Sequence, residues 1–189
     1  MSHVEAVLPE HARGKPLEIW LQDEARVGEI GTLTYIWAQK GTRPSALRDQ
    51  RYECAYIFGA VCPARGTGAA LIMPHANTAA MKAHLDEIST KVEKASHAVV
   101  IIDGAGWHTT KSLQVPSNLS LLRLPPYSPE LNPQENIWQF MRQNKLANRC
   151  YDSYDDIVEA CCQAWNDLIA LPKTIKSIAS REWMQCVRS

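Results

Sequence analysis

The stretch Ala98-Val99-Val100-Ile101-Ile102-Asp103 consists of five apolar residues that run directly into a carboxylate, and Gly104 follows. A run that is apolar on both faces is typical of a central parallel strand with helices on each side. We therefore expect an α/β protein with an inner strand at residues 99–102. An Asp-Gly pair after a strand is a common turn, but ligands of open α/β sheets also lie beyond the carboxyl ends of strands. Position alone leaves both interpretations of Asp103 open.

A second acid is predicted near the end of a strand at residues 17–25. Its apolar residues alternate from Leu17 to Leu21, and this parity places Asp23 on the same core-facing side. A carboxylate on that side is costly without a partner, so the parity favours a function for Asp23. Glu24 points to the opposite face, and we interpret it as either a surface group or a group that supports the site.

The third acid, Glu135, lies in Ser128-Pro129-Glu130-Leu131-Asn132-Pro133-Gln134-Glu135-Asn136-Ile137-Trp138. From spacing alone, the simpler interpretation is a capping box with Asn132 as N-cap and Glu135 at the third helical position. The two roles do not conflict, because a helix N-terminus favours an ionised carboxylate by about 0.3–1 kcal/mol.

The remaining pattern alternates between strand and helix periodicity. Strands are expected at residues 35–38, 54–61, 69–73 and 119–124, with a turn at 66–68; helices are expected from a cap at Asn77, at 133–148, at 154–170, and from Pro172 through Trp183. This order matches a ribonuclease-H-like α/β fold: a mixed central sheet of about five strands flanked by helices, with a helical C-terminal third. We expect one domain at residues 17–189 after an extension at 1–16.

Two acids at strand ends and one at a helix start can converge on one point. Such a cluster of Asp23, Asp103 and Glu135 repels itself unless a divalent cation binds it. Hard cations such as Mg²⁺ take carboxylate ligands and complete their shell with water and substrate phosphates. The pattern therefore points to phosphoryl transfer.

The overall charge is the one bulk property that argues against a nucleic-acid enzyme. The chain has 20 basic and 20 acidic residues, for a formal net charge of zero. Basic residues nevertheless gather locally at 40–65 and 111–149, and local basic surfaces are enough to hold phosphates. The sequence shows no apolar stretch of membrane-spanning length, no signal-peptide core and no CxxC pair among its six cysteines. These features predict a cytosolic protein without a membrane partner.

The stretch from Leu124 to Trp138 closely resembles the third-acid motif of mariner-type DDE transposases, especially the bacterial branch called the insertion-sequence 630 family. Ile102–His108 resembles the second-acid motif of that branch, and Gln22–Arg26 resembles the first. The resemblance implies a ribonuclease-H-like catalytic domain that binds two Mg²⁺ or Mn²⁺ ions and cuts and joins DNA. Carried over by motif position, the catalytic and metal-binding residues are Asp23, Asp103 and Glu135.

The resemblance also implies a reaction and its partners. Two metal ions would activate water to nick DNA at the ends of an insertion sequence, and then activate the freed 3′-hydroxyl to attack target DNA. The implied partners are the transposon ends, the target duplex and a second copy of the chain in a homodimer, on DNA in the bacterial cytosol.

Four further residues are candidates to support the acids or contact DNA: Glu24, His108, Arg142 and Lys145. A hydrogen-bonded structural role for His108 is equally compatible with the sequence. Trp107 and Trp138 are interpreted as packing residues.

Two departures from the family pattern qualify the resemblance. The gap between Asp103 and Glu135 is a few residues shorter than usual, and the shortening falls around 112–118, which we expect to be a loop. Only about 16 residues precede the first strand, too few for the usual helix-turn-helix domain, so we expect a catalytic fragment or one half of a split transposase. The alternatives are another ribonuclease-H-like nuclease, or a non-catalytic remnant that binds DNA or a partner transposase chain.

Overall fold

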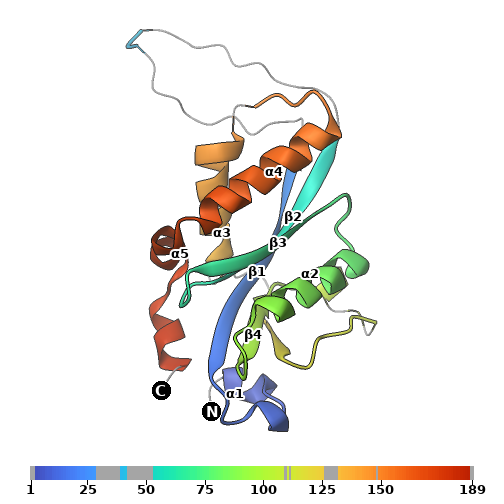
Figure 1. Ribbon diagram of the computed structural model, residues 1–189, viewed down its shortest axis with the longest axis vertical. Helices are drawn as coiled ribbons and strands as arrows, with labels where there is room; N and C mark the ends of the chain where they lie inside the picture. The colour runs from blue at the N-terminus through green and yellow to red at the C-terminus, as the bar shows by residue number, and fades with distance from the viewer. Residues whose placement is uncertain are drawn as a thin grey trace.

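The computed structural model describes residues 3–28, 39–41, 53–108, 110, 112–125, 132–147 and 149–187 of the 189-residue chain. The strand expected at 35–38 lies outside these residues, as does most of the stretch that leads to Glu135, at 126–131. The described part forms a single sheet with helices on both faces (Figure 1).

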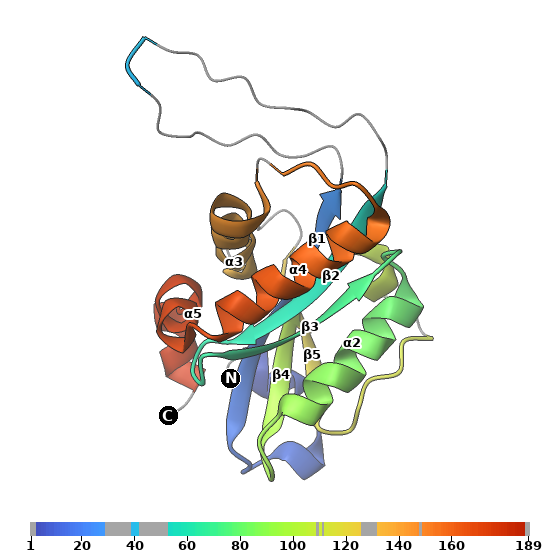
Figure 2. The ribbon, with the colours of Figure 1, turned by 45° about the horizontal axis from the view of Figure 1, so that its top comes forward.

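Five strands form one mixed sheet, and β1 lies at its centre (Figure 2). The strand order is β3-β2-β1-β4-β5; β1 pairs antiparallel with β2 and parallel with β4, while β2–β3 is antiparallel and β4–β5 is parallel. The bounds are Leu17–Gly28 (β1), Cys54–Cys62 (β2), Thr67–Met73 (β3), His97–Ile102 (β4) and Leu119–Arg123 (β5). This is the ribonuclease-H-like sheet expected from the order of elements.

The central strand β1 changes partners along its length. It pairs with β4 from Leu17 to Leu21 and with β2 from Leu21 to Gly28. The buried residues of β1 are 18–22. They lie in the part of β1 that runs beside β4, up to the end of β4. Asp23 therefore lies where β1 continues beyond β4, so its β4 side faces the segment that follows Ile102.

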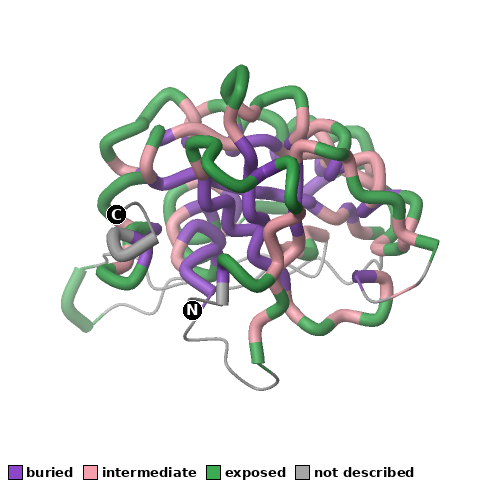
Figure 3. The backbone as a smooth tube through the Cα atoms, turned by 90° about the horizontal axis from the view of Figure 1, so that it is seen from below, coloured by how far each residue is buried: buried purple, intermediate pink, exposed green. Residues whose placement is uncertain are grey.

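Helices cover both faces of the sheet and enclose two apolar cores (Figure 1). Helix α2 (Thr78–Lys91) covers one face, and α3 (Gln134–Met141), α4 (Tyr154–Ile169) and α5 (Pro172–Ala179) cover the other. The residues of β4 divide between the cores in strict alternation: Val99 and Ile101 join the α3–α5 side, whereas Val100 and Ile102 join the α2 side. All six residues of β4 are buried, which confirms the two-sided burial predicted from its composition. Buried backbone accordingly occupies the middle of the molecule and exposed backbone its outside (Figure 3).

Side-chain caps begin the two longest helices. Asn77 accepts a hydrogen bond from the Ala80 N–H at 2.9 Å at the start of α2, as the sequence predicts. Ser153 accepts one from the Asp156 N–H at 3.2 Å at the start of α4.

Three element boundaries differ from the expected ones. The turn between β2 and β3 occupies residues 63–66, with Gly66 at a φ of 68°, so Thr67 and Gly68 already belong to β3. Helix α3 continues as a π-helical turn (η4, Arg142–Leu146) that ends two residues before the expected position. Helix α5 ends at Ala179 because Ser180 is extended, and Trp183 lies in a separate 3-10 segment (η5, Glu182–Val187).

The N-terminal extension packs on the domain. It contains α1 (His3–Val7) and a 3-10 turn (η1, Glu10–Ala12), and α1 contacts β5. Val4 is part of the core on the α3–α5 side of the sheet. Among the helices of the described ranges, none has the length and apolarity that a membrane crossing requires.

Candidate active site

Three elements bring the predicted acids to one end of the parallel strands. Asp23 lies opposite Gly59 of β2, and the β1–β4 register, extended by two residues, places it beside Asp103. Glu135 begins α3 on the face of the sheet to which Asp23 points, and it interacts electrostatically with Asp23.

Two hydrogen bonds hold the Asp23 carboxylate. Its Oδ1 accepts the backbone N–H of Glu24 at 2.8 Å, and its Oδ2 accepts the indole N–H of Trp138 at 3.1 Å. Burial raises the pKa of Asp23 to about 7, repulsion from Glu24 and Glu135 adds to this, and the two hydrogen bonds oppose it. Asp23 is therefore a carboxylate whose ionised form lacks compensating positive charge.

Asp103 follows β4 and turns the chain with its own side chain. Its Oδ1 accepts the Ala105 N–H at 2.9 Å, which is the Asx turn that an Asp-Gly pair favours. The side chain is 49% exposed, and the same oxygen lies 2.8 Å from Nδ1 of His108. The turn and a ligand role are compatible, because Oδ2 is not used by either contact.

His108 bridges the first two acid motifs from inside the protein. Its side chain is fully buried, its Nε2 lies 2.9 Å from Glu24 Oε1, and its Nδ1 faces Asp103. The Nδ1 contact has an ion-pair distance but not the alignment of a good hydrogen bond. Burial lowers the pKa of His108, but the carboxylates of Glu24 and Asp103 outweigh burial, and the net pKa is raised. The raised pKa favours the imidazolium form, in which both ring nitrogens carry protons.

Glu24 is an interior residue on the α2 side of the sheet. Its side chain is only 8% exposed, and Oε1 accepts from Gln22 Nε2 at 2.9 Å and from Trp107 Nε1 at 3.4 Å, besides its contact with His108. Of the two interpretations left open by the sequence, these contacts agree with a supporting group and not with a surface group.

Glu135 lies at the first turn of α3 with a 54% exposed carboxylate. Its Oε2 pairs with Arg142 at 3.5 Å. The N-cap of α3 is Pro133, not Asn132 as the capping box predicts, although Asn132 Oδ1 does accept the Gln134 N–H at 3.2 Å just ahead of the helix. The side chain of Glu135 thus pairs along its own helix in the described contacts, where the capping box predicts a return bond to the cap.

The two basic candidates on this side of the molecule are both paired. Arg142 pairs with Glu135, and Lys145 Nζ lies 2.7 Å from Asp167 Oδ2 of α4. The Lys145 ion pair therefore connects η4 to α4.

The carboxylates of Asp23, Asp103 and Glu135 are suitable ligands for a hard divalent cation, although their side chains do not converge on one point. Within the described ranges, no three His, Cys, Asp or Glu side chains are grouped closely enough to hold a metal ion. The reason lies in the contacts above, since Asp103 turns toward His108 and Glu135 toward Arg142. The oxygen ligands and the excess negative charge at Asp23 still fit Mg²⁺ or Mn²⁺.

The sequence predicted only a packing role for Trp138. In the structure its indole N–H also donates a hydrogen bond to Asp23. A signal was present, since Trp138 follows Glu135 by three residues and therefore shares its side of the helix. The direction of the indole N–H depends on packing against α4 and β2, which no local pattern encodes.

Comparisons with known proteins identify the family of this chain. The family model described as DDE superfamily endonuclease matches residues 18–158. The uncharacterized protein y4pE/y4sA of Sinorhizobium fredii is 58% identical over 129 residues, which covers 68% of this chain and 96% of that protein.

Solved structures of the Mos1 mariner transposase share the fold. The Mos1 paired end complex with Mn superposes with a TM-score of 0.60 at 16% identity, covering 87% of this chain and 56% of the Mos1 chain. The Mos1 strand transfer complex gives a TM-score of 0.56 at 16% identity, with 87% and 55% covered. The chain thus spans little more than half the length of these Mos1 chains. On the family match and the relative together, the chain belongs to the DDE superfamily endonucleases.

Proposed function

We propose that this chain is the catalytic domain of a DNA transposase of the mariner-type superfamily, in its bacterial insertion-sequence 630 branch. Asp23, Asp103 and Glu135 would hold Mg²⁺ or Mn²⁺, with two ions in the active complex. The observation that supports the proposal is that Asp23 of β1 lies in register with Asp103 after β4 and interacts electrostatically with Glu135 of α3, although the three carboxylates are not grouped as a closed site. The family match and the fold shared with Mos1 support it.

The residues supply binding sites and charge, and the ions supply the chemistry. Mg²⁺ or Mn²⁺ held by Asp23, Asp103 and Glu135 would supply Lewis-acid chemistry, which offsets phosphate charge and lowers the pKa of a bound water molecule. Asp23, with a pKa of about 7, is partly protonated at neutral pH without a cation. It would release that proton from its carboxyl group when a cation is held, so binding should be stronger at pH 8 than at pH 6.

Two side-chain rotations would complete the site. Asp103 would turn Oδ2 toward the ion while His108 keeps Oδ1 in place, and Glu135 would leave Arg142. Arg142 would then be free to contact a DNA phosphate close to the acids. Lys145 is less available for a DNA contact than Arg142, because it is paired with Asp167.

His108 and Glu24 would act as positioning residues in this scheme. Neither needs to touch the ion, since both lie on the α2 side of the sheet. The imidazolium would compensate part of the negative charge of Glu24 and Asp103 in the absence of metal.

The proposed substrates are the ends of an insertion sequence and a target duplex, with a homodimer as the active complex. The Mos1 structures are a paired end complex and a strand transfer complex, and the proposal extends this kind of assembly to the present chain. End recognition would come from a separate region or chain.

The test separates catalysis by Glu135 from helix capping. Glu135→Gln keeps the size and hydrogen-bonding capacity needed at a helix start, but removes the anionic ligand. We expect the free energy of unfolding to change by less than about 1 kcal/mol, and Mn²⁺-dependent nicking of supercoiled DNA to fall by orders of magnitude.

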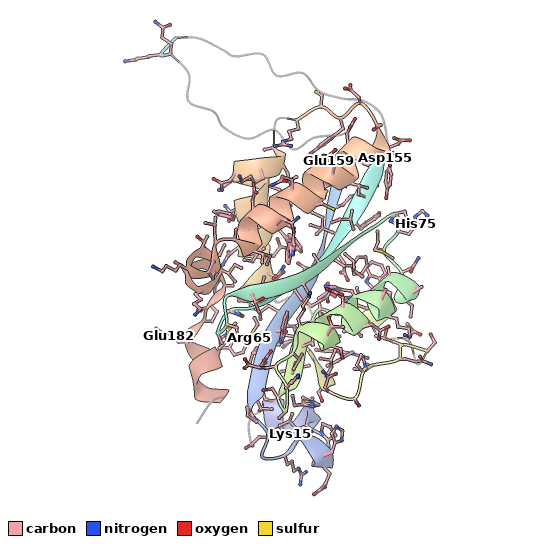
Figure 4. All side chains as sticks on the ribbon, in the orientation of Figure 1. Lys15, Arg65, His75, Asp155, Glu159 and Glu182 are labelled. Carbon is pink, nitrogen blue, oxygen red and sulfur yellow. The ribbon has the colours of Figure 1, made fainter. Side chains whose placement is uncertain are left out.

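The matched control is Glu159→Gln on α4. Glu159 is exposed and lies near Asp155 at one end of the helix (Figure 4). This variant should nick DNA like the wild type. If the wild-type chain alone does not nick, a DNA-binding partner chain is supplied to all three proteins. A stable Glu135→Gln variant that nicks at the wild-type rate would return Glu135 to a structural role.

A further inference from the structure

Trp138 packs beside Asp23, in space that is open because Gly59 has no side chain. Gly59 of β2 is the residue directly across the strand pair from Asp23. A Cβ at Gly59 would overlap the ring of Trp138 and lie 2.9 Å from Cζ3 of Trp165. The glycine therefore lets the Trp138 ring approach β2 closely at the level of Asp23.

The position of the ring is fixed by packing on several sides. Trp138 is 2% exposed, and its ring centroid lies 6.2 Å from that of Trp165. In this place the indole N–H reaches Asp23 Oδ2 at 3.1 Å. A buried indole N–H needs an acceptor, and this one has a carboxylate, so burial and hydrogen bonding favour the same position.

The hydrogen bond also links two of the three acid-bearing elements. Trp138 lies one turn beyond Glu135 in α3, whereas Asp23 belongs to β1. Any movement of α3 relative to β1 would change the Trp138–Asp23 bond and the spacing of two proposed ligands together. The bond leaves room for a metal ion, because a carboxylate oxygen can accept at more than one site.

We infer that Trp138 is a positioning residue that holds the Asp23 carboxylate in the orientation needed for metal binding, in the space left by Gly59. The inference rests on the proposed metal-dependent function. Partners that orient metal ligands typically contribute 10–100-fold to metal affinity. Trp138→Phe keeps an aromatic ring against β2 and removes the donor.

Metal affinity gives the first measurement. Mn²⁺ binding is followed by electron paramagnetic resonance of the free ion, for the wild type, Trp138→Phe and Trp165→Phe. Trp165 packs on the same glycine but is not a hydrogen-bond donor to Asp23 in the described contacts, so its variant controls for lost aromatic packing. We expect Mn²⁺ affinity to fall about tenfold in Trp138→Phe and to remain at the wild-type level in Trp165→Phe.

The indole N–H gives a second measurement that does not require a folded Trp138 variant. In ¹⁵N-labelled protein, the Trp138 indole cross peak is assigned through its own ring protons. We expect it to move in Asp23→Asn and on addition of Mg²⁺, while the Trp165 cross peak changes far less. A role in packing alone would leave the Trp138 peak insensitive to both changes.

The outcomes separate this inference from the proposed function. The inference is wrong if the Trp138 cross peak does not move in Asp23→Asn. It is also wrong if Trp138→Phe binds Mn²⁺ with the affinity of the wild type. If Glu135→Gln weakens Mn²⁺ binding but Trp138→Phe does not, the inference alone fails. If the wild type binds neither Mn²⁺ nor Mg²⁺, both proposals fail.

Discussion

Asp23 and Glu24 are neighbours in the chain, yet their carboxylates lie on opposite faces of the sheet and have different partners. Asp23 faces α3 and bonds to Trp138, whereas Glu24 faces α2 and bonds to His108. Alternation along the strand predicted this division, because side chains of a strand alternate between faces. Besides donors next to them in the chain, each carboxylate meets a side chain more than 80 positions away, Trp138 for Asp23 and His108 for Glu24, which no local pattern could identify.

The unfolding free energy of the metal-free protein should depend on the protonation of Asp23. Because the pKa of Asp23 is about 7 in the folded state and 3.8 for an unperturbed carboxyl group, the folded protein binds more protons between these pH values. The unfolding free energy should therefore fall as pH rises from about 4 to 7, and level off above 7. At pH 8, Asp23→Asn should be more stable than the wild type by about 1–4 kcal/mol.

Urea unfolding in the presence of a chelator, at pH 5 and pH 8, measures this difference. Glu159→Gln serves as the exposed control and should follow the wild type at both pH values. An Asp23→Asn variant that loses as much stability as the wild type between pH 5 and 8 would contradict the assignment. Added Mg²⁺ at pH 8 should stabilise the wild type more than Asp23→Asn.

At the scale of elements, the periodicity of apolar residues predicted those helices and strands whose packing environment stays the same along their length. The two-sided burial of β4 and the helix expected at 154–170, which is α4, both appear in the structure. The end of β1 differs from the expected strand at 17–25. It extends to Gly28 because β2 pairs with it there. The π-helical turn of η4 likewise has no sequence signal that we recognise. Pairing and packing of distant segments decide such boundaries.

A buried carboxylate at the opposite end of β1 joins three elements of the α2 side. Glu18 accepts from Trp20 Nε1 at 2.8 Å, from Arg65 Nη1 at 3.1 Å and from the Glu93 N–H at 3.0 Å. Arg65, in the turn between β2 and β3 (Figure 4), also donates to the Lys91 carbonyl at 2.7 Å, at the end of α2. One guanidinium thereby connects β1, the β2–β3 turn and α2.

Arg65→Ala should destabilise the fold, because it leaves Glu18 buried without its cation. We expect the unfolding free energy to fall by about 1–3 kcal/mol at pH 7. Lys82→Ala is the comparison, since it breaks the exposed Lys82–Asp86 pair on α2 and should change stability by less than about 0.5 kcal/mol. Chemical denaturation of both variants checks the contrast. Equal effects would mean that the Glu18–Arg65 pair is no more important than a surface pair.

At the scale of the whole molecule, the zero net charge limits what this chain can do alone. Long-range attraction to DNA needs excess positive charge, and the chain has 20 basic against 20 acidic residues. The basic side chains of Arg142, Lys145 and Arg65 are each paired with an acid. Charge counting from sequence predicted the balance, but not which cations are already paired.

We predict weak and strongly salt-dependent DNA binding with little sequence preference. The dissociation constant should lie on the order of 1–100 μM at physiological salt, as for nonspecific contacts. Fluorescence anisotropy with insertion-sequence end DNA and scrambled DNA, at several salt concentrations, measures it. A thousandfold preference of this chain for the end sequence would show that recognition resides within it.

The placement of β1 also determines when, during synthesis on the ribosome, the acids can meet. All strands of the β1–β2–β3 meander have been synthesised once residue 73 has left the exit tunnel. Asp23 must then wait for β4, whose last residue is Ile102, and for α3, which begins at Gln134. A prematurely terminated or still growing polypeptide can therefore hold a folded edge of the domain, but it carries only one of the three acids. The proposed metal site can therefore assemble only after Glu135 has left the ribosome.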